Sequence, residues 1–180
     1  MAAPGISQRW VNVDLLTTEY RLVGKTLVGS SGLYGTLIDQ TKSFIEIRQA
    51  QVAYLRSTRR VIRQFASACI LKAHIYAACL EMIEYAGPQS VSHGGYTTFQ
   101  SYPVHVAFSS FEMECLVKWA GRFEISAVLA ESMGKFLQVY DVRIQSSIIP
   151  GFGIENPAAL VNMSQVDLMA TPPEPEKRAV

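Results

Sequence analysis

The stretch FIEIRQAQV at residues 44–52 carries the pattern that decides the fold, and FLQVYDVRI at residues 136–144 carries it again. In the first stretch Ile45 and Ile47 alternate as in a strand, and the alternation then continues one residue out of phase. Such a slip turns every later side chain to the other face unless a bulge or a corner absorbs it. The second stretch slips at the same place, after Val139. The pattern therefore predicts a sharply bent strand in each copy, of the kind that closes a small barrel.

A second alternating pattern recurs at nearly the same distance along the chain. Residues 20–28 and 111–119 each place apolar or small side chains at every second position, 91 positions apart. A period this long in a chain of 180 residues predicts a duplicated β-unit. We therefore expect a lead-in at residues 1–16, a first β repeat at 17–86, a connector at 87–108, a second β repeat at 109–171 and a disordered tail at 172–180.

Residues 58–86 allow two interpretations. Propensity favours a helix, because the stretch is rich in alanine and is followed by Gly87 and Pro88. The offset of 91 instead aligns residues 68–78 with 159–169, where Val161, Met163 and Val166 indicate a strand. We favour strands, so the predicted fold class is all-β with two tandem small barrel-like domains. The alternative is an α+β fold with a helix at about residues 58–86.

Two shorter segments carry weaker signals. Alternating apolar residues between Trp10 and Leu15 could add an edge strand to the first unit. The loop GSSGLYG at residues 29–35 has three glycines and no signal for a following helix, so we expect a plain turn between strands.

The segments ILKAHIYAA at residues 70–78 and LVNMSQVDLM at residues 160–169 close the two units. The order of segments is similar to that of a small uncharacterised bacterial β domain of unknown function. It consists of a strand, a bent strand and then a segment of the form L-V-N-x-S-Q-V. The resemblance implies an Sm-like or split-barrel fold, present here as a tandem duplication. It implies no established activity.

Composition limits the classes of protein that need to be considered. Apolar residues make up 49% of the chain and charged residues 17%, which suffices for a packed core. A net charge of +1 gives no long-range attraction to nucleic acid or to an anionic membrane, and it mildly favours a protein that lives in an assembly. The N-terminus lacks the pattern of a secretory signal, and three cysteines without framework spacing indicate reduced thiols. We therefore expect a cytoplasmic protein without a membrane span.

Four arginines form the most marked charge cluster of the sequence: Arg56, Arg59, Arg60 and Arg63. Guanidinium groups suit bidentate contacts with phosphate, and they also suit ion pairs with an acidic protein surface. We expect this cluster to contact phosphate or a partner. No nucleophile, metal or cofactor motif accompanies it, so we expect a protein that has no cofactor and is not an enzyme.

The connector is rich in aromatic residues, and Tyr96, Phe99 and Tyr102 are candidate partner anchors. Small barrels leave sheet edges with which another strand can pair. The sequence thus favours a non-catalytic interaction or scaffold protein, either oligomeric or a subunit of a larger complex. The alternative is a small-barrel protein that binds nucleic acid or a nucleotide through the cluster at residues 56–63, with an affinity that falls as salt rises.

Overall fold

The structure, a computed structural model, describes residues 8–55, 61–87, 98–132, 135–146, 149 and 151–173. The first half, residues 8–87, contains in chain order β1 (Arg9–Leu16), β2 (Tyr20–Val28), α1 (Gly32–Ile38), β3 (Phe44–Tyr54), β4 (Arg63–Leu71), the 3₁₀ helix η2 (Lys72–His74), β5 (Ala77–Leu80) and the 3₁₀ helix η3 (Ile83–Tyr85). The second half, residues 98–173, contains β6 (Phe99–Ala107), β7 (Phe111–Ala120), α2 (Ile125–Ser132), β8 (Phe136–Ser146), β9 (Gly153–Asn162), the 3₁₀ helix η4 (Met163–Gln165) and β10 (Leu168–Ala170).

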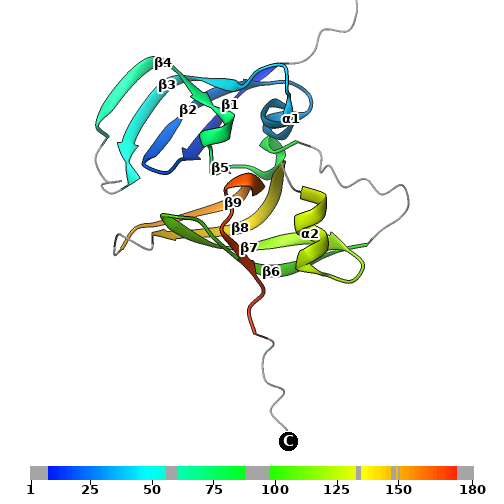
Figure 1. The fold of residues 1–180 in the computed structure, drawn as a ribbon. Helices are drawn as coiled ribbons and strands as arrows, with labels where there is room; N and C mark the ends of the chain where they lie inside the picture. Colours follow the sequence, from blue (N-terminus) through cyan, green and yellow to red (C-terminus); the bar gives the residue numbers. More distant parts are fainter. Residues whose placement is uncertain are drawn as a thin grey trace, which may run out of the picture.

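Within the described residues, ten strands form one sheet in the order β10-β6-β7-β8-β9-β5-β1-β2-β3-β4, and every neighbouring pair is antiparallel. The prediction of an all-β fold is confirmed. Figure 1 shows the two halves lying one against the other, with β5 and β9 between them. The sheet differs from the expected pair of barrels, because it runs through both halves and its two end strands, β4 and β10, do not pair with each other.

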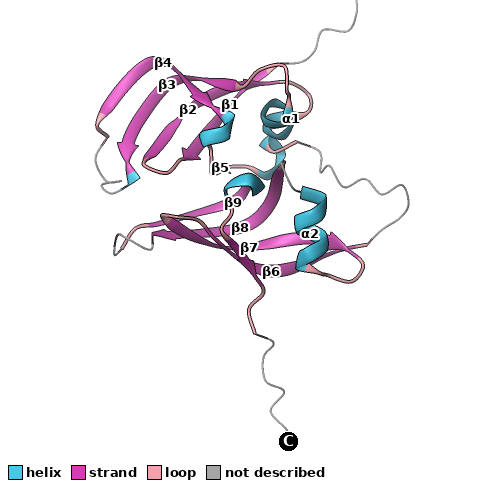
Figure 2. Cartoon of the chain, in the orientation of Figure 1, coloured by secondary structure: helices cyan, strands magenta, loops and turns pink. Residues whose placement is uncertain are grey.

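The helix considered for residues 58–86 is wrong for the residues that the structure describes. Residues 63–71 form β4, which pairs with β3 along its whole length, and residues 77–80 form β5. Among the described residues 63–86, the only helical segments are the short 3₁₀ turns η2 and η3 (Figure 2). Pairing with neighbouring strands outweighs the helix propensity of the alanines here, because propensity is a weak local preference.

The order β-β-α-β-β-3₁₀-β occurs twice along the chain. Pairings recur with it: Leu16 lies opposite Ala77 in the first half, and Ala107 lies opposite Leu168 in the second, each 91 positions on. Strand β4 of the first half corresponds to β9 of the second. Strand β3 pairs with β4, and its counterpart β8 pairs with β9 in the same way. We call residues that occupy the same place in the two halves counterparts; their offset is 91 in β4 and β9 and 92 in β3 and β8.

The bent strands predicted from the phase slip are confirmed. Strand β3 changes register against β2 between Val23 and Lys25, and β8 changes register against β7 at the corresponding place. At these points Gln49 has φ of 52° and Asp141 has φ of 48°, a conformation that L-residues rarely adopt. Gln49 and Asp141 are the extra residues of the two bulges. The bulge restores the alternation, so the apolar side chains point into the core on both sides of the bend.

Three connecting segments differ from their expected form. The alternating residues of the lead-in form β1, which lies between β5 and β2 and is therefore an inner strand instead of an edge strand. Residues 99–107 of the expected connector form β6. The glycine-rich loop leads directly into helix α1, whose first residue, Gly32, has φ of 66° and packs so closely on Gly87 that a Cβ would lie 2.6 Å from the Gly87 Cα.

Two clusters of buried side chains form the core, and each draws on both halves of the chain. The cluster of the first half packs α1 against β1, β2 and β3, and it also includes Phe136 and Leu160 of the second half. The cluster of the second half includes Leu16, Leu55, Ala77 and Cys79 of the first half. Each half therefore completes its apolar interior with side chains of the other.

Candidate functional site

The two halves are joined by an antiparallel strand pair. Strand β5, the last strand of the first half, lies beside β9, the fourth strand of the second half, with Ala77 opposite Val161 and Leu80 opposite Ala158. The faces of β5 belong to different cores: Ala77 and Cys79 contribute to that of the second half, and Ala78 and Leu80 to that of the first. All four side chains of this strand are buried. The junction is thus a continuation of the sheet and of both apolar interiors.

Polar contacts between the turns η2 and η4 reinforce this junction. The buried Asn162 side chain donates from Nδ2 to the Ile75 carbonyl oxygen at 2.9 Å, and its backbone N–H donates to the Tyr76 carbonyl oxygen at 2.9 Å. Its Oδ1 accepts from the Ser164 N–H at 3.1 Å, which caps η4. Gln165 adds a bond from Nε2 to the Ala73 carbonyl oxygen at 3.0 Å. The N-x-S-Q segment therefore holds the first half in place.

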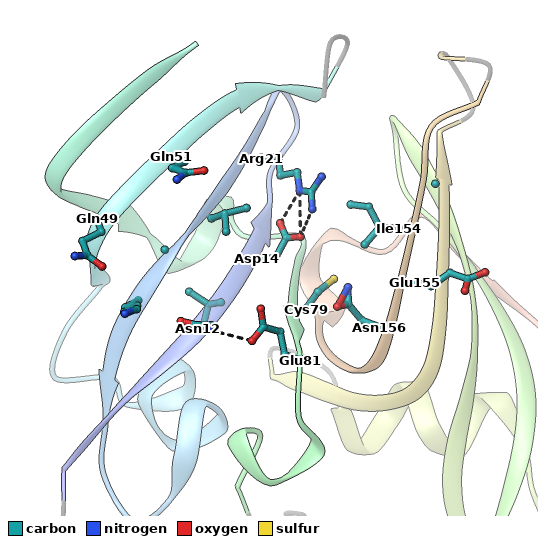
Figure 3. A pocket seen from close by; sticks show the side chains of 15 residues that line it. Asn12, Asp14, Arg21, Gln49, Gln51, Cys79, Glu81, Ile154, Glu155 and Asn156 are labelled. Carbon is teal, nitrogen blue, oxygen red and sulfur yellow. Dashed lines mark hydrogen bonds and ion pairs between the residues drawn. The ribbon is translucent and has the colours of Figure 1, made fainter. Parts of the chain in front are cut away.

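A polar cleft of about 560 Å³ lies along this junction, lined by residues of β1, β2, β3, β5 and β9 (Figure 3). Within it, Arg21 forms a bidentate ion pair with Asp14, with Nη2 2.6 Å from Oδ2 and Nε 2.9 Å from Oδ1. The hydrogen bonds that Arg21 donates to Asp14 raise the pKa of Arg21, so the guanidinium group stays charged. Asn12 donates to Glu81 at 3.0 Å nearby.

The reactive side chains of the cleft include a thiol and a carboxylate. The Cys79 thiol lines the cleft, but burial raises the pKa of this thiol and keeps it protonated. The carboxylate of Asp14 is already held by Arg21. In the part of the chain that the structure describes, no group of three His, Cys, Asp or Glu side chains is placed to hold a metal ion. Polar groups of the cleft instead pair within the first half, Arg21 with Asp14 and Asn12 with Glu81.

The two ends of the sheet are strands with one open side. Among the described residues, β4 and β10 each pair with a single neighbour, so one side of each strand presents unpaired backbone groups. Large apolar side chains are exposed on both: Phe65 is 43% exposed and Leu71 50% exposed on β4, and Leu168 is 54% exposed on β10. We call these two surfaces the β4 edge and the β10 edge.

Beside the β4 edge lies a groove of about 570 Å³, which we call the β4 groove. Its lining residues are Thr17, Thr18, Glu19, Tyr20, Leu22, Val52, Cys69, Ile70 and His74. The floor is largely apolar, formed by Leu22, Val52 and Ile70. The groove is therefore an opening into the core of the first half.

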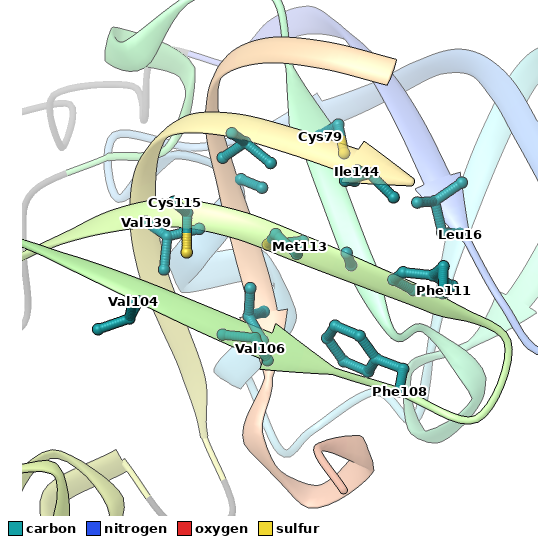
Figure 4. Packing of buried hydrophobic residues seen from close by; sticks show 14 of the residues in the cluster. Leu16, Cys79, Val104, Val106, Phe108, Phe111, Met113, Cys115, Val139 and Ile144 are labelled. Atoms are coloured by element: carbon teal, nitrogen blue, oxygen red, sulfur yellow. The ribbon is translucent and has the colours of Figure 1, made fainter. Parts of the chain in front are cut away.

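The corresponding place in the second half is filled. The counterparts of Tyr20 and Leu22 are Phe111 and Met113, which pack with Leu16 in the core (Figure 4). The Tyr76 ring stacks on Phe108 at 5.7 Å between ring centroids. Side chains of the first half thus cover the opening of the second half, while the counterpart opening of the first half remains uncovered among the described residues.

The structure places only one of the four clustered arginines. Arg63 begins β4 and is exposed at the β4 edge. Arg56, Arg59 and Arg60 lie outside the described residues, so their contact with phosphate or with a partner stays a prediction. Arg63 nevertheless lies on the β4 edge, where one side of the strand has unpaired backbone N–H and C=O groups among the described residues.

The three candidate anchors have different surroundings. Tyr96 lies outside the described residues, whereas Phe99 is 38% exposed at the start of β6. Tyr102 is half-buried, stacks on Phe123 at 4.6 Å between ring centroids, and donates from its hydroxyl group to the Gly121 carbonyl oxygen at 3.1 Å. Tyr102 therefore already has a structural role within the second half.

Sequence reasoning did not find the β10 edge, the β4 groove or the junction contacts of Asn162. The signal was present in the offset of 91, which makes β10 the counterpart of β5 and β4 the counterpart of β9. The sequence does not show that β5 pairs with β9. Without that pairing, the offset alone could not identify β4 and β10 as the two ends of the sheet.

The comparisons with known proteins bring no relative. No family model, no curated protein and no solved structure matches the chain. Among the described residues, no helix has the length and apolar character needed to cross a membrane.

Proposed function

We propose that this chain is a non-catalytic interaction or scaffold protein that associates through the ends of its sheet. The observation that carries the proposal is the exposure of apolar side chains on two end strands, together with an open groove beside one of them. Open strand edges pair readily with other chains, and soluble proteins usually protect them with charges, prolines or bulges. Here Phe65, Leu71 and Leu168 occupy positions where such protection is expected.

We further propose that the two halves descend from one duplicated unit. The support is the double occurrence of the element order and of the bulge, with counterparts 90–93 positions apart at the starts of the elements. An Sm-like or split-barrel type for that unit and a bacterial origin stay predictions of the sequence resemblance. A cytoplasmic location stays a prediction from the N-terminus and the three cysteines. Binding of nucleic acid by the arginine cluster also stays a prediction, because no contact of Arg63 in the structure favours it over a protein partner.

Light scattering at micromolar concentration tests the interaction role. We expect a mass above the 19.9 kDa of one chain. The variant Leu71→Lys places a charge on the β4 edge and should lower that mass, because an edge lysine disfavours pairing. Leu27→Lys is the matched control, since Leu27 is 37% exposed on the inner strand β2 and should leave the mass unchanged. A wild-type protein that remains a single chain would contradict self-association.

A further inference from the structure

We propose that the partner of this surface is a second copy of the same chain, bound head to tail, with its β10 added to β4 in the register that β5 and β9 use within the chain, and that the contact closes into a ring. This proposal rests on the proposed function and specifies its partner. The junction within the chain serves as the template: a last strand, β5, pairs with a fourth strand, β9. The counterpart last strand is β10, the counterpart fourth strand is β4, and these two are the ends of the sheet.

The register follows from the offset. Ala77 lies opposite Val161 within the chain, so their counterparts Leu168 and Ile70 should lie opposite each other between chains. The same arithmetic places Met169 opposite Cys69. An antiparallel pair in this register continues the sheet, because β10 already pairs with β6 as β5 pairs with β1.

The faces of both strands agree with this arrangement. Met169 is buried in the core of its own half, as its counterpart Ala78 is. Leu168 is 54% exposed, whereas its counterpart Ala77 is fully buried against the other half. Leu168 is therefore exposed at a position whose counterpart is buried at the junction within the chain. A second copy would bury the Leu168 side chain at the β4 groove, whose floor includes Ile70.

The groove itself supplies an independent observation. In the second half, the counterpart opening is occupied by Leu16 and Tyr76, which come from the adjoining half. In the first half, no described residue of the same chain covers the opening at Leu22 and Cys69. In the proposed assembly, the second half of another chain lies against this opening, as the first half lies against the second within one chain.

The symmetry of the contact decides the kind of assembly. The β4 edge and the β10 edge are different surfaces, so the contact is heterologous and repeats until the assembly closes or grows without end. A ring removes both open edges from every copy, whereas a filament leaves one at each end. We therefore assign a closed ring of identical chains.

Crosslinking through the native Cys69 tests the register. Cys69 is exposed, while Cys79 and Cys115 are buried with raised pKa values and should not react. The variant Met169→Cys places a thiol directly opposite Cys69 of the next chain, within the separation that a disulfide spans. Mild oxidation should then give crosslinked chains on a non-reducing gel. The control Ala170→Cys points to the other face of the strand and should give none.

A second pair of substitutions guards against misfolding, because Met169 is only 8% exposed. Ala68 and Ala170 are small, partly exposed and opposite each other in the proposed register. In a Cys69→Ser background, Ala68→Cys together with Ala170→Cys should crosslink between chains, and neither substitution alone should do so. The bands should end at a fixed number of chains that equals the mass found by light scattering.

The outcomes separate this inference from the proposed function. An oligomer in which neither designed pair crosslinks would overturn the head-to-tail register and leave the interaction role standing. Masses that grow without limit with concentration would overturn the ring. A single chain at every concentration would overturn both.

Discussion

The side-chain amide of Asn162 donates to the carbonyl oxygen of Ile75 at 2.9 Å, and these two residues belong to different halves of the chain. Asn162 is 5% exposed and uses its Oδ1 to cap η4, so both ends of the amide are satisfied in a buried place. A buried polar group that is fully paired favours one arrangement of its surroundings, because any displacement leaves donors or acceptors without partners. Asn162 thus fixes how β9 sits beside β5.

The first prediction concerns this amide. Asn162→Ala should lower the free energy of unfolding by about 1–3 kcal/mol, because it removes the side-chain donor to the Ile75 carbonyl oxygen. Chemical denaturation followed by circular dichroism measures the change. Gln165→Ala is the control: Gln165 makes one exposed bond across the same junction, to Ala73, and its loss should cost no more than about 0.5 kcal/mol. Equal losses in the two variants would contradict the role of Asn162.

The second prediction concerns the bends in β3 and β8. Gln49→Gly should raise the free energy of unfolding by up to about 1 kcal/mol, because glycine relieves a left-handed conformation that costs other residues about 1–2 kcal/mol. Asp141→Gly should behave alike. The control is Gln51→Gly in the extended part of β3, which should lower stability by about 0.5–1 kcal/mol. Thermal unfolding distinguishes the opposite signs.

These bends also mark what the sequence could predict. Side chains of a strand alternate with a period of two, so a one-residue slip requires a bulge. The apolar residues around Ile47 and Ala50 therefore predicted the bend of β3 from the sequence alone. The same comparison favoured strands over a helix for the residues that form β4 and β5. Local patterns that a strand imposes on itself are thus visible along the chain.

The arrangement of the strands in the sheet was not visible in this way. Strand β5 has only four residues, all of them buried, so it has no alternation by which a face could be assigned. Its pairing with β9 is a contact between residues about 80 positions apart, such as Ala77 and Val161. Helix α1 was missed because its seven residues, GLYGTLI, include two glycines, which disfavour a helix. Packing of Leu33 and Leu37 in the core stabilises it.

The third prediction concerns the three thiols. Burial raises the pKa of Cys115 to about 12 and also raises that of Cys79, so neither forms a thiolate near neutral pH. Cys69 is exposed. An aromatic disulfide reagent should therefore modify one thiol rapidly in dilute native protein and three in denaturant. Cys69→Ser should abolish the rapid reaction, whereas Cys115→Ala should leave it intact; rapid modification of the Cys69→Ser protein would contradict the buried placement of the other two.

The last prediction concerns charges at the proposed contact between chains. Within the chain, Arg21 and Ile154 line the polar cleft together (Figure 3), and their counterparts are Glu112 and Arg63. A second copy in the proposed register therefore brings Arg63 of one chain near Glu112 of the next. Exposed ion pairs contribute about 0–1 kcal/mol, so Arg63→Glu should weaken association by up to about tenfold through repulsion added to the lost pair.

The reversed pair provides the decisive comparison. Glu112→Arg alone should weaken association in the same way, and the double variant that combines it with Arg63→Glu should recover most of the lost affinity, because the charges again oppose each other. Sedimentation at low and high salt measures the association, and the differences should shrink in high salt as the charges are screened. Arg143→Glu is the matched control, since Arg143 is exposed on the inner strand β8 and pairs with Glu155 of its own chain. Additive losses in the double variant would show that Arg63 and Glu112 do not face each other.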